Sequence, residues 1–333
     1  FFFKQKTAYE IYQCDWSSDV CSSDLMAEQA APLFEKVAAF NKNLYSEGHY
    51  YIAQSQGLQG VALWRIGTPE SKASGLKLLQ SAVENIVHPR NADYLDQFGI
   101  RPDIRQLIIA TYIECVSELE PSRVVHALGL ADWLRSGSVQ EALSDAALRA
   151  AANTQGLSEL VRKDQDAKNE INGLRSYLQG STGEAQTNLP EVATQIRSRI
   201  NALEKERNLL QAQIKAGFPD YERLVRPLPP KLDEISQRLN SDEALLVVMP
   251  DANGTNVWAV KQEKGETKAK YYRSKLNAMQ LDKTVATLRL SLESIATLGR
   301  VTKYDNNLAY QLYKDLIEDR KSTRLNSSHT DIS

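Results

Sequence analysis

Apolar residues recur at intervals of three and four along most of the first two thirds of the chain, and this spacing places them on one face of an α-helix. The pattern predicts helices over residues 29–46, 51–66, 71–87, 104–119, 122–134 and 139–152. Gly67-Thr68-Pro69 separates the second helix from the third, because glycine ends helices well and Thr before Pro suits a helix start. We therefore expect antiparallel helices stacked as hairpins.

Small and large side chains alternate in the second and third of these segments. The residues concerned are Ala53, Gly57, Ala62, Leu63, Trp64, Gly67, Ala73, Leu78 and Ala82. Small residues let neighbouring helices approach closely, and the pattern resembles a degenerate tetratricopeptide repeat. No clean period runs through the whole array, so a non-repeating helical bundle is the alternative.

Two later segments, 157–178 and 189–214, carry apolar residues at the heptad spacing of a coiled coil. The intervening residues 180–188 are polar and few, so the two helices are expected to pair antiparallel as a protruding hairpin. Asp164 and Arg207 each interrupt one of the apolar seams. Antiparallel pairing would bring them close, and we predict a charged pair or mutual solvation that serves register rather than catalysis.

The period of the pattern changes from helical to alternating near residue 243. Residues 243–249 form a short apolar run, and the turn cluster Pro250-Asp-Ala-Asn-Gly-Thr255 follows it. Two further short runs, 256–261 and 269–273, are joined by a charged loop, which predicts an antiparallel β-meander. Helical spacing then returns over 276–292 and 306–317, and we expect both helices to pack against the sheet.

The region where the chain turns from helical to mixed α/β resembles the start of a CHAT domain. This caspase-like cysteine peptidase module commonly follows tetratricopeptide-type repeats in bacterial proteins. The resemblance is carried by an ordered set of short motifs: Phe218-Pro-Asp-Tyr221, Leu224-Val225, Pro227, Leu239, Asp242-Glu-Ala-Leu-Leu246 and Val257-Trp-Ala-Val260. Ala146-Ala-Leu-Arg149 and residues 157–166 are similar to the segment that joins the repeats to this module.

The resemblance implies a fold and an activity. In the family, a cysteine at the end of a core strand attacks the peptide carbonyl and a histidine takes its proton. Neither residue can be mapped onto this sequence, because residues 312–317 are followed by Lys321-Ser-Thr-Arg-Leu-Asn326 where the family continues toward the histidine. We expect that the reading frame leaves the gene just before the active site, so that this chain is an inactive fragment with no catalytic residue.

Both ends of the chain differ in character from the rest. Residues 1–25 and 320–333 resemble peptides produced by translation of sequencing-adapter DNA, and we exclude both from fold reasoning. The alternatives are a genuine N-terminal tail and a Ser-rich disordered tail. The expected organisation is a helical array over 26–156, a coiled-coil hairpin over 157–217 and the start of a CHAT-like α/β domain over 218–319. The fold class is therefore mainly α with an incomplete α/β part.

Cysteine and histidine offer little chemistry once the ends are excluded. Cys14 and Cys21 lie in the first segment, and Cys115 lies among apolar residues at helical spacing, which predicts a buried small hydrophobe. Pairing Cys115 with His126 is excluded, because Pro121 breaks the helix that would have to connect them.

The remaining histidines do not form a recognisable site. His49 and His88 are isolated in the sequence, like His126, so no spacing typical of a metal site or catalytic dyad can be drawn. The charged run Arg162, Asp164 and Asp166 is typical of a solvated helix face. The sequence predicts no catalytic residue, no cofactor and no metal.

Charge and hydropathy exclude several kinds of partner. Lys and Arg number 40 against 42 Asp and Glu, and they form no basic stripe for nucleic acid. No apolar run approaches the roughly 20 residues that span a bilayer. One remaining cysteine is compatible with a reducing compartment, and we expect a cytoplasmic protein.

Two functions remain open. In the first, the array and hairpin bind a protein partner or substrate, which the caspase-like domain of the parent protein cleaves. In the second, the protein is a non-catalytic scaffold in which helical hairpins present a concave binding surface and the α/β part serves docking.

Overall fold

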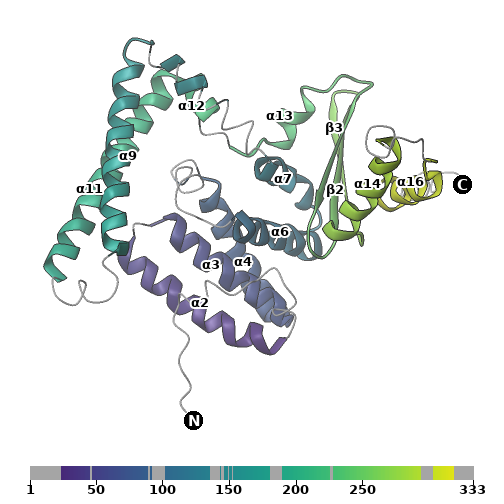
Figure 1. Ribbon diagram of the computed structural model, residues 1–333, viewed down its shortest axis with the longest axis horizontal. Coiled ribbons are helices and arrows are strands. Elements are labelled where there is room, and N and C mark those ends of the chain that lie inside the picture. Colours follow the sequence, from purple (N-terminus) through teal and green to yellow (C-terminus); the bar gives the residue numbers. More distant parts are fainter. Residues whose placement is uncertain are drawn as a thin grey trace, which may run out of the picture. The chain divides into compact units, whose positions relative to one another are not determined.

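The chain is described by a computed structural model that covers residues 24–45, 47–88, 91, 102–135, 143, 146–148, 150–151, 153–180, 190–225, 228–293 and 303–318. These residues are mainly helical, with a three-stranded sheet late in the chain (Figure 1). They fall into two compact units. The first contains the described residues up to Cys115 together with Trp133–Pro229, and the second contains Val116–Asp132 and those from Pro230 onward.

The first unit begins with the predicted helical array. Its helices are α2 (Asp24–Leu44), α3 (Tyr50–Ile66), α4 (Pro69–Ile86) and α6 (Pro102–Leu119). Helix α3 packs against both α2 and α4. The predicted turn is confirmed: Gly67 ends α3 with a left-handed φ of 84°, and the Thr68 side chain accepts a hydrogen bond from the Ser71 N–H at the start of α4.

Glycines allow the array helices to approach one another closely. A Cβ atom at Gly60 would lie 2.8 Å from Leu79 Cγ, and one at Gly75 would lie 3.0 Å from the Gly60 carbonyl oxygen, so α3 and α4 touch along their backbones. A Cβ at Gly57 would lie 2.7 Å from the Ile108 side chain of α6. The alternation of small and large residues therefore has a packing function, whereas the tetratricopeptide resemblance stays a prediction.

The helix predicted over 122–134 begins later and is divided in two. Pro121–Arg123 form a turn, in which the Arg123 N–H donates to the Glu120 carbonyl. A 3₁₀ turn, η3 (Val124–Ala127), and the short helix α7 (Leu128–Arg135) follow. Ser122 does not start the helix, because the turn satisfies the backbone first. Most of the helix predicted over 139–152 lies outside the described residues.

The predicted antiparallel hairpin is present as α9 (Leu157–Gly180) and α11 (Pro190–Gly217). One apolar cluster joins the two helices through Ala167, Ile171, Ile200 and Leu203. A second cluster unites Ala151, Leu157 and Val161 with Ile214, near the opposite end of α11. This order of contacts requires antiparallel pairing. Most of these residues are predicted heptad positions, but Val161 is buried where the sequence predicted Leu160, which is only partly buried. A short helix, α12 (Pro219–Val225), follows.

The second unit contains the predicted β-meander. After α13 (Leu232–Ser236), strands β1 (Ala244–Pro250), β2 (Thr255–Glu263) and β3 (Glu266–Ser274) pair antiparallel in the order β1-β2-β3. The loop predicted between the last two strands is shorter than expected. Only Lys264 and Gly265, with φ values of 55° and 82°, form the turn, since a two-residue hairpin turn with positive φ matches the twist of the strands.

One face of the sheet is covered by the segment that joins α6 to α7. Val247, Trp258 and Tyr271 lie opposite one another on the three strands, and Trp258 is fully buried. Its Nε1–H donates to the Val124 carbonyl oxygen at 2.9 Å. No pattern in the sequence pointed to this association of residues 116–132 with the sheet.

The other face of the sheet and the helices that follow it are less completely buried. Val257 is inaccessible, but Leu246, on the same face, is 42% exposed. The two predicted helices are confirmed as α14 (Ala278–Leu292) and α16 (Asn306–Tyr313), and α16 continues into the π-helical turn η4 (Lys314–Glu318). Of the predicted apolar face of α14, Leu281 and Leu288 are buried, whereas Val285 and Leu292 are exposed.

The glycine contacts in the array predict opposite effects for two Gly-to-Ala substitutions. Gly60→Ala should destabilise the first unit by about 1–3 kcal/mol, because the added methyl group overlaps Leu79. Gly173→Ala is the matched control: this residue lies on α9 with no atom within 4 Å of the new Cβ. It should stabilise by about 0.5–1 kcal/mol through the lower entropy of the unfolded chain. Urea unfolding of the two variants measures both effects, and equal effects would contradict the close packing.

Candidate functional site

The structure gives no support for thiol or metal chemistry in the residues that it describes. Cys115 is fully buried on α6, as predicted, and a buried thiol in apolar surroundings is a core residue rather than a nucleophile. His88 and His126 are exposed, whereas His49 is buried. Within the described ranges no group of three or more His, Cys, Asp or Glu could hold a metal ion.

The first polar cluster is the charged pair predicted in the hairpin. Arg207 Nε and Nη2 donate to the two carboxylate oxygens of Asp164, both at 3.0 Å, and Gln211 adds a third hydrogen bond at 3.2 Å. The Arg207 and Asp164 side chains are only 11% and 10% exposed. The prediction of a charged pair is confirmed. Arg162 and Asp166 are exposed, so the solvated face was predicted correctly for them, but Asp164 points into the seam.

This pair selects the register of the hairpin. A carboxylate that leaves water loses several kcal/mol of solvation, and only a well-aligned partner offsets that loss. A shift of α11 by one turn, about 5.4 Å, would place an apolar residue opposite Asp164 and leave both charges buried without a partner. The pair therefore acts against alternative pairings of two otherwise repetitive apolar seams.

A second cluster lies at the corner between α2 and α3. His49 caps α3, since its Nδ1 accepts a hydrogen bond from the Tyr51 N–H at 3.2 Å. The Tyr45 ring stacks on His49 with a centroid distance of 4.2 Å and an interplanar angle of 19°. Burial raises the pKa of the Tyr45 phenol, so its ring stays neutral.

The hairpin contributes two charged side chains to the same place. Arg175 Nη2 donates to Glu204 Oε1 at 2.6 Å and lies 3.2 Å from His49 Nε2. We call Tyr45, His49, Tyr51, Arg175 and Glu204 the corner cluster. The hairpin was predicted to protrude, and this was wrong at Arg175, where a polar pair beside the apolar seam docks onto the aromatic corner.

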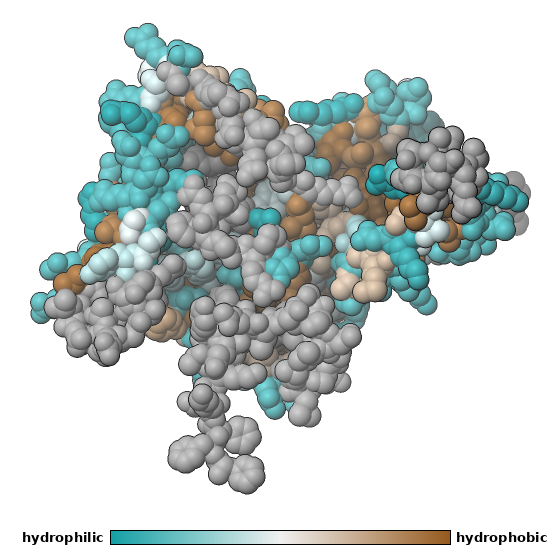
Figure 2. All heavy atoms as spheres, in the orientation of Figure 1, coloured by the Kyte–Doolittle hydropathy of each residue, from teal (hydrophilic) through white to brown (hydrophobic). Residues whose placement is uncertain are grey.

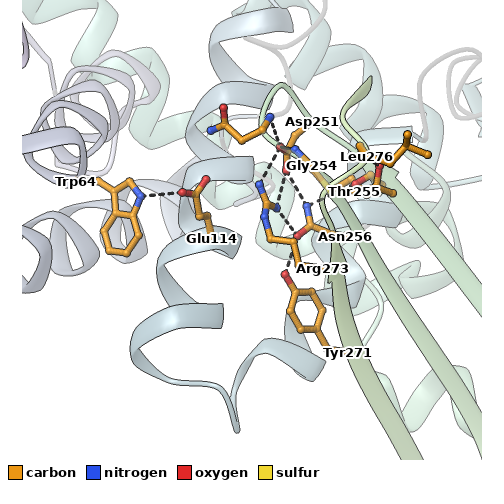
Figure 3. A network of polar contacts seen from close by, with 11 residues as sticks. Trp64, Glu114, Asp251, Gly254, Thr255, Asn256, Tyr271, Arg273 and Leu276 are labelled. Carbon is orange, nitrogen blue, oxygen red and sulfur yellow. Dashed lines mark hydrogen bonds and ion pairs between the residues drawn. The ribbon is translucent and has the colours of Figure 1, made fainter. Parts of the chain in front are cut away.

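The third cluster surrounds Asp251 in the turn between β1 and β2 (Figure 3). Its Oδ1 accepts hydrogen bonds from the backbone N–H groups of Asn253 and Gly254 at 2.8 and 3.0 Å. Arg273 on β3 binds both carboxylate oxygens, at 2.8 and 2.9 Å, and Asn256 Nδ2 donates to Oδ2 at 2.9 Å. The carboxylate is 8% exposed, and five donors surround it.

The Asp251 network also determines where the next helix begins. Asn256 Oδ1 accepts hydrogen bonds from Tyr271 and Arg273, both at 2.7 Å, which ties the turn to β3. The Asp251 carbonyl accepts the Ala278 N–H at 2.9 Å in the first turn of α14. Because every oxygen of the carboxylate is engaged, Asp251 has no capacity left to act as a base or to bind a ligand, and the network is structural.

Part of this network could have been found in the sequence. An Asp three residues before a Gly, within a turn cluster, is typical of a side chain that binds its own turn backbone. The partner Arg273 lies 22 positions away on another strand, and nothing in its neighbourhood marks it. The corner cluster was missed for the same reason, since Arg175 is separated from His49 by 126 positions.

The accessible surface of the hairpin is mostly hydrophilic in the view of Figure 2. Two large apolar side chains interrupt this surface: Tyr177 on α9 is 58% exposed and Leu209 on α11 is 68% exposed. In the part of the chain that the structure covers, no helix is long and apolar enough to cross a membrane.

In comparisons with known proteins, no family model matches the chain, and no match was found among curated proteins or solved structures.

The buried pair of the hairpin predicts strong energetic coupling between its two members. Asp164→Ala or Arg207→Ala should each destabilise the first unit by about 3–5 kcal/mol, because each leaves a buried charge without its partner. The double variant should lose less than the sum, with a coupling energy of about 1–3 kcal/mol. The matched control is the pair Glu170–Arg199, which also bridges α9 and α11 but is exposed and should show no resolvable coupling. A double-mutant cycle by urea unfolding measures both, and additive effects at Asp164 and Arg207 would contradict the assignment.

The Asp251 network predicts a large local effect of a small substitution. Asp251→Ala should lower the free energy of opening of the sheet by about 2–4 kcal/mol, since the partly buried Arg273 and the backbone N–H groups of the turn would lose their carboxylate. Amide hydrogen exchange of β2 measures the loss. Glu266→Ala serves as the control, because its ion pair with Lys268 is exposed and its loss should leave the exchange unchanged. Unchanged exchange in both variants would argue against a structural network.

Proposed function

We propose that this chain is the partner-binding helical region and the beginning of the α/β domain of a CHAT-type protein. In this proposal the array and the hairpin bind a protein partner, and the parent protein is a caspase-like cysteine endopeptidase that cleaves it. The observation that carries the proposal is the order of elements: helical array, antiparallel hairpin and then an antiparallel meander at residues 244–274. The meander lies where the resemblance of residues 218–260 to a CHAT domain expects strands.

The hairpin is suited to binding a protein. The inner faces of its two helices pack against each other through apolar clusters and one buried ion pair. The outer faces are therefore available for binding without any loss of packing within the hairpin. Protein interfaces are rich in aromatic and large apolar anchors surrounded by polar residues. Tyr177 and Leu209 are such anchors on a hydrophilic surface. A hairpin with one register also presents these side chains in a constant arrangement, which lowers the entropy lost on binding.

The part of the chain that the structure describes is not itself a peptidase in this proposal. A Cys–His dyad needs an accessible thiol within hydrogen-bonding reach of an imidazole. Cys115 is fully buried, and His49 already caps a helix. The reacting cysteine and histidine are therefore expected in a segment of the parent protein outside the residues described here.

A second candidate function is a non-catalytic scaffold. The described residues favour it to the extent that they contain stacked helices and a rigid hairpin but no accessible thiol. In that case the sheet unit would serve docking or assembly, and the parent protein would hydrolyse nothing.

A covalent probe distinguishes the two functions. The full-length product of the gene should be labelled by a peptide acyloxymethyl ketone, which alkylates the thiolate of a cysteine peptidase. The label should map outside residues 26–319, and Cys115→Ser should leave labelling unchanged because that thiol is buried. The present chain should remain unlabelled under the same conditions. A full-length product that stays unlabelled would reject the peptidase and favour the scaffold, and a label on Cys115 would contradict both.

A further inference from the structure

The corner cluster places one imidazole between two hydrogen-bond donors. His49 Nδ1 lies 3.2 Å from the Tyr51 backbone nitrogen, whose N–H it accepts to cap α3. His49 Nε2 lies 3.2 Å from Arg175 Nη2. A neutral imidazole has a lone pair on one ring nitrogen and a hydrogen on the other, whereas an imidazolium has a hydrogen on both. The neutral ring therefore accepts one of these contacts, and the protonated ring can accept neither.

The charges around His49 also disfavour a proton on the ring. The guanidinium of Arg175 is in contact with the ring, and Arg197 is the second cation that acts on the Tyr45 phenol stacked on it. The opposing anion is Glu204, whose Oε1 is 3.9 Å from His49 Nε2 and already accepts a hydrogen bond from Arg175 at 2.6 Å. The guanidinium in contact with the ring thus occupies the carboxylate that would otherwise stabilise an imidazolium.

Water cannot compensate for these contacts while the cluster is closed. His49 is 4% exposed, and the Tyr45 and Tyr51 rings lie 4.2 and 5.5 Å from it, centroid to centroid. An imidazole that is released into water is protonated near pH 6.5, within the range that cells and compartments use for signalling.

We propose that the corner cluster is a proton-operated latch, in which protonation of His49 releases the part of the hairpin around Arg175 from the corner between α2 and α3. The released state takes up a proton, so a fall in pH favours release and a rise in pH favours the closed state. The latch joins the start of α3 to both helices of the hairpin, because Arg175 lies on α9 and Glu204 on α11. This regulation goes beyond the proposed function, which requires the hairpin but not its release.

Amide hydrogen exchange of the whole chain at about pH 7.5 and pH 5.5, corrected for intrinsic rates, tests the latch. For a single proton excluded from the closed state, the opening equilibrium should increase about tenfold over this range. The increase should appear at the first turn of α3, which His49 caps, and around Arg175. His49→Asn should abolish it, because an Asn side chain caps a helix equally well but does not titrate. His88→Asn with His126→Asn is the control, since both of these rings are exposed and the tenfold change should persist.

A second variant reports on the charge that excludes the proton. Arg175→Gln removes the guanidinium and leaves Glu204 beside the ring, so the pH dependence should flatten or reverse sign. A contact with a purely structural role would be weakened at both pH values without any change in the pH dependence. The proposal is overturned if the wild-type chain shows no change between the two pH values, if His49→Asn retains the tenfold change, or if Arg175→Gln retains it.

Discussion

Each of the two units is organised around a buried carboxylate that an arginine binds through both oxygens. In the hairpin this pair is Asp164–Arg207, and in the sheet unit it is Asp251–Arg273. Misalignment of such a buried pair is strongly destabilising, because it leaves a charge without solvent and without a counterion. Apolar seams and short strands can pair in several registers, and the buried ion pairs favour one of these registers over the others.

The two pairs produce different kinds of order. Asp164–Arg207 joins two helices that are consecutive in the chain and sets how far one slides along the other. The Asp251 carboxylate binds its own turn through two backbone N–H groups, and the Asp251 carbonyl binds the first turn of α14. An aspartate therefore fixes the register of two helices in the first unit, and another aspartate fixes the geometry of a turn in the second. Five donors fill the acceptor positions of the Asp251 carboxylate, and Asp164 is buried beside Arg207 within the hairpin. The proposed function therefore lies on the surface of the helical region.

The corner cluster differs from these pairs because its requirements conflict. The imidazole of His49 faces a backbone donor on one side and a guanidinium on the other, and no protonation state satisfies both contacts. The proposed latch depends on this competition, whereas the Asp251 network is fully satisfied. In that proposal a fall in pH loosens the corner cluster and so releases the hairpin that carries the proposed binding surface.

Most of the local structure follows from the amino-acid sequence alone. The antiparallel hairpin with its Asp164–Arg207 pair, the β-meander and the burial of Cys115 were predictable, because each depends on residues close in the chain or on a repeated apolar period. Three contacts became visible only in the folded chain: Trp258 binds the Val124 carbonyl, Arg273 closes the turn of Asp251, and Arg175 reaches His49. These contacts join side chains that carry no periodic signal and lie far apart in the chain, so their partners are chosen by packing rather than by any local pattern.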